Sequence, residues 1–363
     1  DTGTPKTTGR GSRVPRHATL REMWTATGVT RIEHPLPMNH RVMLTGASGT
    51  LGRNILELVA VGSDIDVLAL LRPESRALRT LPRVAVERVD LSDTRQVHEI
   101  TAAFAPTCIV HCAATGMEFP RAEWFDLLRV NIDMAVNFCE LAARMSNCHF
   151  IHVSTGLAYR RQDRPLVESD PLGVSHPYGA SKAAADILVH SAASEFGVPL
   201  TVLRPFSFTG LGDDNTRLFG SLLRAADAGK AFDLSPCEHV RDHCSARDIA
   251  EGILTALRTR QPTDGSARVF NLGSGNDAPL RNVIESVVRQ LALDIDLRFG
   301  TRALRPFEPE YLVADITLAG AQLGWQPTHN LAHAVWQLAR DAFPRLKVTE
   351  PDEHLEGAIG CRK

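Results

Sequence analysis

A glycine-rich segment, TGASGTLG at residues 45–52, constrains the fold of this chain more than any other feature. It follows the apolar run RVMLT and leads into LGRNILELVAV, in which apolar residues recur at helical spacing. Gly46, Gly49 and Gly52 therefore lie in a turn between a strand and a helix. Glycines in such a turn let the backbone approach a pyrophosphate at the helix N-terminus. The segment predicts a dinucleotide site; the alternative is a loop that needs glycine only for its backbone conformation.

The rest of the first half of the chain alternates short apolar runs with helical periods. Strands that are apolar on both faces, separated by helical segments, indicate a parallel sheet covered by helices on each side. We therefore expect an α/β fold with a Rossmann-type doubly wound parallel sheet. Its predicted strands lie at residues 41–45, 66–71, 84–89, 108–114, 149–155 and 198–205.

After about residue 204 this rhythm loosens. Helical segments at 218–229, 247–259 and 280–292 alternate with short strand candidates at 230–234 and 268–273. This pattern predicts a smaller C-terminal α/β lobe laid over one end of the sheet. We divide the chain into a mobile N-terminal extension (1–37), a dinucleotide-binding domain (38–205), a part that is mainly the substrate-binding lobe (206–345) and a C-terminal tail (346–363).

Composition narrows the expected partners and compartment. The 363 residues carry a formal net charge of −2, and the sequence pI is about 6.7, so nucleic acid and membrane surfaces are not expected partners. No apolar run reaches the roughly 18 residues of a membrane-spanning helix, and no signal pattern opens the sequence. The scattered cysteines lack metal-ligand spacing, and Cys108 and Cys112 are expected to be reduced core thiols. We expect a cytoplasmic protein without a metal site.

The strand predicted at 66–71 ends where a dinucleotide site usually provides its ribose-binding residue, about 20 residues beyond the glycines. An NAD site normally has a carboxylate there, whereas this chain has Arg72, with Arg76 nearby. A guanidinium suits a 2′-phosphate through charge-assisted hydrogen bonds, which favours NADP over NAD. Glu74 keeps NAD possible, and a solvated arginine at a strand end is the alternative role of Arg72.

The segment YGASK places Tyr178 and Lys182 four residues apart at the start of a helix-friendly stretch. On a helix the two side chains lie one turn apart on the same face. A phenol beside an ammonium is either an ordinary surface pair or a proton donor with a lowered pKa. The pair alone does not decide between these roles.

Together, the glycine loop and the Tyr-Lys pair resemble the short-chain dehydrogenase/reductase superfamily, specifically its extended branch of nucleotide-sugar epimerases, dehydratases and ketoreductases. The resemblance spans about residues 40–342 and includes, in family order, VDLSD, HCAAT, VNI, HVSTGLAY, LRPFSFTG, HVRDH, FNLGSG and LGWQP. It implies an NAD(P)-dependent oxidoreductase that acts on a nucleotide-diphosphate sugar. The implied cofactor-binding residues are Gly46, Ser48, Gly49, Thr50, Leu51, Gly52, Arg72, Asp90, Leu91, Ala113, Ala114, Asn131, Tyr178, Lys182 and Pro205.

The resemblance also implies catalytic roles for Thr155, Tyr178 and Lys182. Tyr178 would exchange a proton with the sugar C4 oxygen while hydride moves at the nicotinamide. Because a free tyrosine titrates near pH ~10, Lys182 and the positive nicotinamide would stabilise the phenolate and lower its pKa. Lys182 would also hold the nicotinamide ribose. The Thr155 hydroxyl would bind the same C4 oxygen, with a simple capping role as its alternative.

On the substrate side, the resemblance implies contacts from Thr155, Ser207 and Arg241. Arg241, in the segment HVRDH, matches the family arginine that grips the nucleotide-sugar diphosphate. A guanidinium fork suits phosphate oxygens well. The alternative for Arg241 is a structural ion pair with Asp242.

Two departures from the family pattern bear on the reaction. Dehydratases carry Asp-Glu directly after the active threonine, where this chain has Gly156 and Leu157, so 4,6-dehydration is not expected. Epimerases commonly carry an asparagine in the segment LRPFSFTG, where this chain has Ser207. With Arg72 favouring NADP, we expect an NADPH-dependent reductase of an NDP-4-keto-6-deoxyhexose at C4, in deoxysugar biosynthesis. The alternative is an NAD-dependent 4-epimerase of UDP-hexoses or UDP-hexuronates.

Two further functions fit the sequence less well. A reductase of lipophilic ketones has no use for a diphosphate-binding segment such as HVRDH, and a non-catalytic binding module would not need the intact catalytic set. The resemblance finally implies a homodimer, formed through two long helices at about 123–146 and 178–196.

Overall fold

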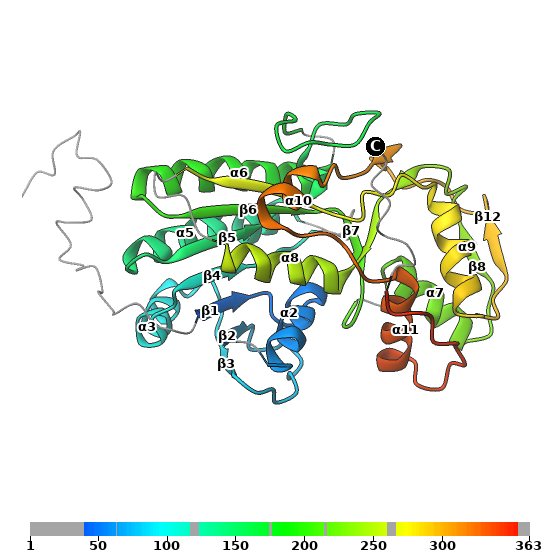
Figure 1. Ribbon diagram of the computed structural model, residues 1–363, viewed down its shortest axis with the longest axis horizontal. Helices are drawn as coiled ribbons and strands as arrows, with labels where there is room; N and C mark the ends of the chain where they lie inside the picture. Colours follow the sequence, from blue (N-terminus) through cyan, green and yellow to red (C-terminus); the bar gives the residue numbers. More distant parts are fainter. Residues whose placement is uncertain are drawn as a thin grey trace, which may run out of the picture.

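A parallel seven-stranded sheet forms the centre of the molecule in the computed structural model, which describes residues 40–62, 64–116, 123–173, 176–213, 216–259 and 266–354 (Figure 1). Its strand order is β11-β6-β5-β4-β1-β2-β3, and every neighbouring pair is parallel. This doubly wound order confirms the predicted fold class. The strands are β1 (His40–Thr45), β2 (Ile65–Leu71), β3 (Val84–Arg88), β4 (Cys108–His111), β5 (His149–Val153), β6 (Leu200–Pro205) and β11 (Arg268–Leu272).

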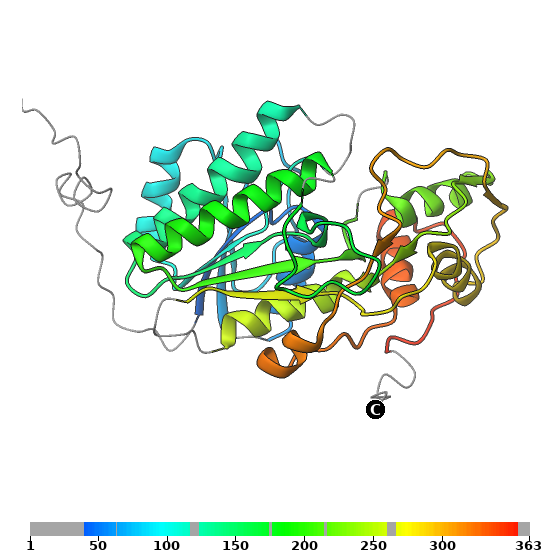
Figure 2. The same ribbon diagram turned by 90° about the horizontal axis from the view of Figure 1, so that it is seen from above.

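Helices cover both faces of this sheet, as Figure 2 shows. One face carries α2 (Thr50–Ala60), α8 (Ala246–Arg258) and α10 (Thr317–Leu323); the other carries α3 (Thr94–Phe104), α5 (Met134–Arg144) and α6 (Pro177–Phe196). Successive strand residues point to opposite faces, so both layers need apolar strand positions. In β1, Leu44 packs into the first core and Met43 into the second. Because both faces of each central strand are buried, these strands appear in the sequence as continuous apolar runs.

A smaller lobe, on the right of Figure 1, has its own hydrophobic core. It contains α7 (Leu218–Asp227), α9 (Leu280–Gln290), α11 (Leu331–Ala342) and the pair β8 (Phe232–Leu234) with β12 (Leu297–Phe299). Two more short parallel pairs are β7 (Ser207–Thr209) with β10 (His243–Ser245), and β9 (Val240–Arg241) with β13 (Tyr311–Leu312). The strand predicted at 230–234 and the helices predicted at 218–229 and 280–292 are thus present here.

The chain passes between the two lobes more than once. Strand β11 and helices α8 and α10 all follow residue 206, yet they pack on the large sheet. The predicted division at 205/206 therefore does not separate the two cores. Of the predicted tail, residues up to 354 are described, and Asn330 N donates to Glu353 O at 2.8 Å. The predicted extension, 1–37, lies outside the described residues.

Two composition-based expectations are addressed by the structure. The six described cysteines are free, and Cys108 is buried while Cys112 is half-buried. Cys108 lies in the large core, as expected of a reduced core thiol. None of the described helices combines the length and the apolar character needed to span a membrane.

Candidate active site

The candidate site lies at the carboxyl ends of β1 and β4, which are neighbours in the sheet. The chain after β1 enters α2 on one face, and the chain after β4 leads to α5 on the other face. A doubly wound sheet binds its ligands in the crevice at such a switch point. Gly46, directly after β1, has a φ of +68°, and Gly49 N donates to Gly46 O at 3.0 Å. Ser48 O accepts from Arg53 Nε at 3.1 Å, which fixes the loop on the first turn of α2.

Thr50 begins α2 and connects the glycine loop to the loop before α7. Its hydroxyl lies 3.3 Å from both Gly212 O and Asp213 Oδ1. Asp213 also accepts from Arg217 Nη1 at 2.9 Å, so this second loop has a fixed contact with the glycine loop. Leu51 is buried in the core below. The predicted glycine-loop residues therefore form one structural unit at the start of α2.

The strand end at Arg72 is on the surface. Arg72 Nε lies 3.3 Å from Glu74 Oε1, and both side chains are largely exposed, at 72% and 67%. Arg88 Nη1 donates to three carbonyl oxygens of the same turn, those of Arg72, Pro73 and Ser75, at 3.3, 2.7 and 2.9 Å. Arg72, which was predicted to bind a 2′-phosphate, is thus already paired with the carboxylate of Glu74. Both residues lie on a turn that the hydrogen bonds of Arg88 hold in place.

Asp90 and Leu91 follow β3 at the predicted adenine end of the site. Asp90 Oδ1 accepts from Ser92 N at 2.9 Å and from Ser92 Oγ at 2.7 Å, and these hydrogen bonds lower the pKa of Asp90. Arg129 Nη2 lies 4.0 Å from Asp90 Oδ2. Leu91 packs against the second core. In the protein alone, the Asp90 carboxylate shapes its own turn.

Ala113 and Ala114 follow β4; Ala113 is half-buried and Ala114 is exposed. Ala113 N donates to Thr45 Oγ1 at 3.2 Å, which holds the two strand ends together. Pro205, another predicted contact, ends β6. Ser207 follows within β7, pairs with His243 of β10 and is half-buried.

Asn131 lies in a π-helical stretch, η1 (Leu127–Asp133), that joins α4 (Trp124–Asp126) to α5. Its side-chain amide bonds Thr115 N and Thr115 O at 2.8 and 2.9 Å, and Nδ2 also donates to Ser181 Oγ at 2.8 Å. Single π-type turns inside helices are frequent at functional sites. Asn131 therefore ties the segment after β4 to the helix that carries the Tyr-Lys pair.

Tyr178 and Lys182 lie on the first turns of α6, and Thr155 lies two residues after the end of β5. Tyr178 N donates to Nδ1 of His176, the N-cap residue, at 3.2 Å. Thr155 Oγ1 accepts from Leu157 N at 3.2 Å and caps the short helix η2 (Gly156–Ala158), which packs against α6. The capping role weighed for Thr155 is therefore present. All three predicted side chains are buried in this corner of the molecule.

Burial dominates the electrostatics of Tyr178 and Lys182 in the protein alone. Burial raises the pKa of Tyr178 to about 12, although the cation of Arg217 acts in the opposite direction. Burial lowers the pKa of Lys182 to about 8, and the Asp186 carboxylate opposes that shift. Lys182 Nζ is fully buried and has no hydrogen-bond partner among the described residues. Within the protein itself, desolvation of the phenol thus outweighs the cation of Arg217, and the lowering of the Tyr178 pKa by Lys182 and a bound nicotinamide stays a prediction.

Arg241 is buried in β9 and forms an ion pair with Glu308. His239 Nε2 lies 3.8 Å from the same Glu308 oxygen. The partner considered from the sequence, Asp242, instead accepts from Ser274 N and Gly275 N at 2.7 and 3.0 Å. The alternative of an Arg241–Asp242 ion pair was therefore wrong, and the guanidinium partner comes from a segment 67 residues away.

The sequence-based site omitted both Asp186 and Arg204. Asp186 is almost fully buried, and its Oδ2 accepts from Arg204 Nε at 3.0 Å. Asp186 follows Lys182 by the same four residues that separate Lys182 from Tyr178. This spacing was a signal that could have identified it. Arg204, near the end of β6, is the buried ion-pair partner of Asp186.

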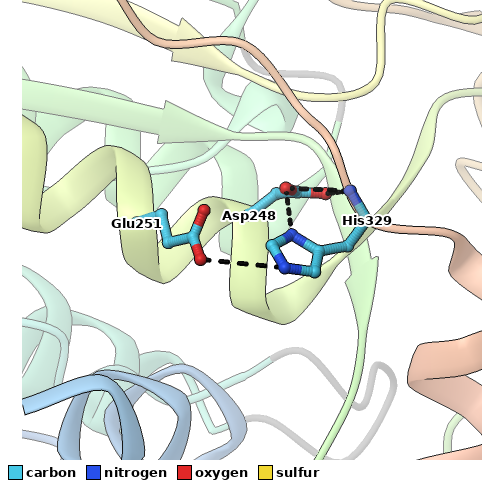
Figure 3. Close-up of side chains that lie close together, drawn as sticks. All are labelled: Asp248, Glu251 and His329. Carbon is cyan, nitrogen blue, oxygen red and sulfur yellow. Dashed lines mark hydrogen bonds and ion pairs between the residues drawn. The ribbon is translucent and has the colours of Figure 1, made fainter. Parts of the chain in front are cut away.

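The described residues also contain one cluster of metal-ligand types away from this crevice, Asp248, Glu251 and His329 (Figure 3). His329 Nδ1 lies 2.7 Å from Asp248 Oδ1, and His329 Nε2 lies 3.8 Å from Glu251 Oε1. Asp248 Oδ1 also accepts from Thr328 N at 2.9 Å. These bonds connect the start of α8 to the segment before α11, so the cluster has a structural role in the fold.

Comparison with known proteins agrees with this geometry. Residues 42–273 match the NAD dependent epimerase/dehydratase family. UDP-glucose 4-epimerase of Lactobacillus helveticus is 26% identical over 315 residues, which cover 80% of this chain and 93% of that protein. The dTDP-6-deoxy-L-talose 4-dehydrogenase (NAD(P)(+)) of Kitasatospora kifunensis is 27% identical over 314 residues. These residues cover 82% of this chain and 94% of that protein.

The fold is also shared with solved structures. UDP-glucuronic acid 4-epimerase from Bacillus cereus, solved with UDP-glucuronic acid and NAD, superposes with a TM-score of 0.73 at 21% identity. The match covers 83% of this chain and 98% of that chain. The family match spans most of the chain and contains both the glycine loop and the Tyr-Lys pair. The chain therefore belongs to the NAD dependent epimerase/dehydratase family and is an enzyme of the extended short-chain dehydrogenase/reductase type.

Proposed function

We propose that this enzyme is an NAD-dependent 4-epimerase of a nucleotide-diphosphate sugar. The observation that carries the proposal is that Thr155, Tyr178 and Lys182 are buried and follow the carboxyl end of β5, in the same sheet whose β1 leads into the glycine loop. The similarity to nucleotide-sugar 4-epimerases supports the same reaction. The sequence alone favoured a 4-ketoreductase, with a 4-epimerase as the alternative. The relatives favour the 4-epimerase.

The residues of the crevice fit a nicotinamide dinucleotide. The buried ammonium of Lys182 lacks a protein partner among the described residues, and a ribose diol would supply one. Gly46 and Gly49 bring backbone close to the N-terminus of α2, where a pyrophosphate is stabilised. Glu74 beside Arg72 offers a carboxylate to ribose hydroxyls, which suits NAD.

A nicotinamide dinucleotide, when bound, would supply the acceptor and donor of the sugar C4 hydride. Tyr178 removes the proton of the C4 hydroxyl, which leaves a 4-keto sugar once C4 has lost its hydride. Thr155 holds the C4 oxygen by a hydrogen bond. When hydride returns to the opposite face of C4, Tyr178 gives the proton back, and the sugar has inverted at one carbon. Because burial raises the pKa of Tyr178, the proton transfer needs the positive charges of Lys182 and Arg217 nearby.

A second candidate is NADPH-dependent reduction of an NDP-4-keto-6-deoxyhexose at C4. Arg72 is the specific observation that favours it, because a guanidinium at the strand end suits a 2′-phosphate. The similarity to a dTDP-sugar 4-dehydrogenase supports it as well. Tyr178 would then only donate its proton to the C4 oxygen.

One experiment separates the two candidates. The nucleotide that remains bound through purification is identified, and the protein is assayed with UDP-glucose and UDP-glucuronic acid without added cofactor. An epimerase retains NAD and interconverts the C4 epimers without net redox change. Release of no dinucleotide, together with NADPH oxidation by an NDP-4-keto-6-deoxyhexose, would establish the reductase instead.

Arg241 is expected to set the affinity for the diphosphate of the substrate. Replacing it in Arg241→Gln should raise KM for the nucleotide sugar by roughly 10–100-fold, the equivalent of about 1.5–3 kcal/mol for a hydrogen bond to a charged group. The value of kcat should change little, because the lost contact is remote from C4. Steady-state kinetics measure both constants.

The Glu308→Gln variant is the matched control for Arg241. It removes the carboxylate that now pairs with the guanidinium and keeps the size of the side chain. A diphosphate that replaces Glu308 as the partner of Arg241 should bind at least as well to this variant. An unchanged KM in Arg241→Gln would exclude Arg241 from the substrate site.

We also propose a homodimer formed through α6 and the helix that begins at α4. Five large apolar side chains on these elements are exposed: Trp124, Phe125, Leu128, Ile187 and Leu188. Clustered exposed apolar residues mark association surfaces in soluble proteins. The two long helices on which they lie are those that the resemblance assigns to dimer contacts.

Replacing Ile187 by lysine is therefore expected to convert the dimer to a monomer. Light scattering after gel filtration should give twice 39.7 kDa for the wild type and 39.7 kDa for Ile187→Lys. Val61→Lys changes an 88% exposed apolar residue elsewhere and should remain dimeric. A wild-type monomer would contradict the proposal.

A further inference from the structure

The helix face that carries the Tyr-Lys pair continues into a buried carboxylate. Tyr178, Lys182 and Asp186 are spaced by four residues on α6, so they lie on one face in successive turns. Their side chains are 7%, 0% and 1% exposed, respectively. An ionised group so far from water needs a fixed partner. The proposed mechanism uses the first two residues and assigns nothing to the third.

Asp186 is held in place from two neighbouring strands. Arg204 of β6 donates Nε to its Oδ2 at 3.0 Å, and His152 of β5 places Nε2 3.4 Å from its Oδ1. Arg204 is itself positioned, since Nη1 donates to Glu168 O at 3.3 Å and its guanidinium lies 4.7 Å from the centre of the Tyr159 ring. Burial opposes ionisation of Asp186, but the contacts with His152 and Arg204 hold its pKa below the ordinary value. The carboxylate is therefore both fixed and charged.

The other groups that face Lys182 carry no negative charge. Burial lowers the pKa of His152, on β5, to about 4 and that of His111, on β4, well below its ordinary value, so both rings are neutral. Burial raises the pKa of Cys112, after β4, to about 12, which leaves a neutral thiol. Tyr178 is a neutral phenol for the same reason. Among these groups, Asp186 is the anion that acts on Lys182.

We propose that Asp186 is a positioning residue for catalysis, which keeps the buried ammonium of Lys182 charged and is held in place by Arg204 and His152. The inference rests on the proposed function, in which charged Lys182 holds the nicotinamide ribose and favours the Tyr178 phenolate. A buried cation without a nearby anion would lose its proton near neutral pH. Asp186 thereby extends the active site one helical turn below the residues that touch substrate and cofactor.

The pH dependence follows from the direction of this effect. The charged form of Lys182 is present below its pKa of about 8 and is lost as pH rises through that value. The Asp186 carboxylate raises this pKa, so the neutral variant Asp186→Asn must lower it. An opposite charge at close range shifts a pKa by about 1–3 pH units. The alkaline limb of activity should therefore move to lower pH by at least about one unit.

The test compares the wild type with Asp186→Asn and Asp186→Glu, the second of which keeps the charge. For each protein, kcat/KM for the nucleotide sugar and Kd for NADH and NADPH are measured between about pH 6 and 10. In Asp186→Asn, we expect the fall in kcat/KM and the loss of dinucleotide affinity at alkaline pH to occur at lower pH than in the wild type. In Asp186→Glu, we expect both changes to occur near the pH of the wild type. A merely structural carboxylate would reduce stability or rate without moving either limb.

A single neutral substitution leaves Arg204 buried and unpaired, which can prevent folding. The double variant Asp186→Asn, Arg204→Gln removes both charges together and should show the same alkaline shift. If the wild type converts no nucleotide sugar, the proposed function fails, and the pH profile of dinucleotide Kd still decides the role of Asp186. Superimposable profiles in the wild type and the folded neutral variants would overturn the inference.

Discussion

Replacing Tyr178 by phenylalanine is expected to lower kcat by about 10²–10⁴-fold, the usual contribution of a positioned general acid or base. The side chain is 7% exposed, so the ring that remains fills the same space and the fold is kept. The substitution removes only the ionisable phenol oxygen. Tyr178 is the only tyrosine in α6, so no other residue of this helix can replace its phenol. Steady-state rates, with Tm and dinucleotide Kd measured alongside, check the prediction.

Tyr159 provides a matched control for this substitution. It is a second buried tyrosine, 3% exposed, and burial raises the pKa of its hydroxyl to about 12 as well. Its hydroxyl donates to Asn271 Oδ1 at 2.7 Å, so Tyr159→Phe loses a structural hydrogen bond. We expect a lower Tm and a nearly normal kcat in Tyr159→Phe, and the reverse pattern in Tyr178→Phe. Activity of Tyr178→Phe close to that of the wild type would exclude the proposed mechanism.

The sequence predicted the large sheet well because its signals are local. Each strand of a doubly wound sheet is buried on both faces and therefore leaves a continuous apolar run, such as residues 66–71. The glycine loop and the Tyr-Lys pair are equally local, since each depends on spacing within a single turn or helix. This is why the sequence alone predicts Gly46, Tyr178 and Lys182 as cofactor-binding residues.

The features that the sequence did not predict depend on pairing between distant segments. Arg241 meets Glu308 across 67 residues, and Asp186 meets Arg204 across 18. The return of β11 to the large sheet also depends on long-range pairing, with β6 as its partner. A pattern along the chain cannot specify which cation meets which anion. The raised pKa of Tyr178 has the same origin, because burial depends on the packing of several elements around one side chain.

Replacing Gly52 by alanine is expected to destabilise the protein and to weaken dinucleotide binding together. A Cβ at this position would lie 2.4 Å from Gly46 O and 2.5 Å from Ala47 Cα, and neither backbone atom can move without opening the loop. Overpacking of this kind costs about 1–3 kcal/mol in the free energy of unfolding. Alanine is otherwise the better helix former, so any loss of stability reports the close approach of α2 to the loop. Denaturant unfolding and fluorescence titration with NADH measure the two effects.

Gly49→Ala is the control that separates the fold from the ligand. Gly49 has a φ of −77°, which any residue adopts, and its added Cβ would lie 3.4 Å from Gly46 O, an ordinary contact. The free energy of unfolding should therefore stay unchanged in Gly49→Ala, while dinucleotide affinity falls, because the second glycine of such a loop lets backbone approach the pyrophosphate. If Gly49→Ala bound NADH as tightly as the wild type, the pyrophosphate would not lie against this loop, and the glycines would serve only the packing of α2 on β1.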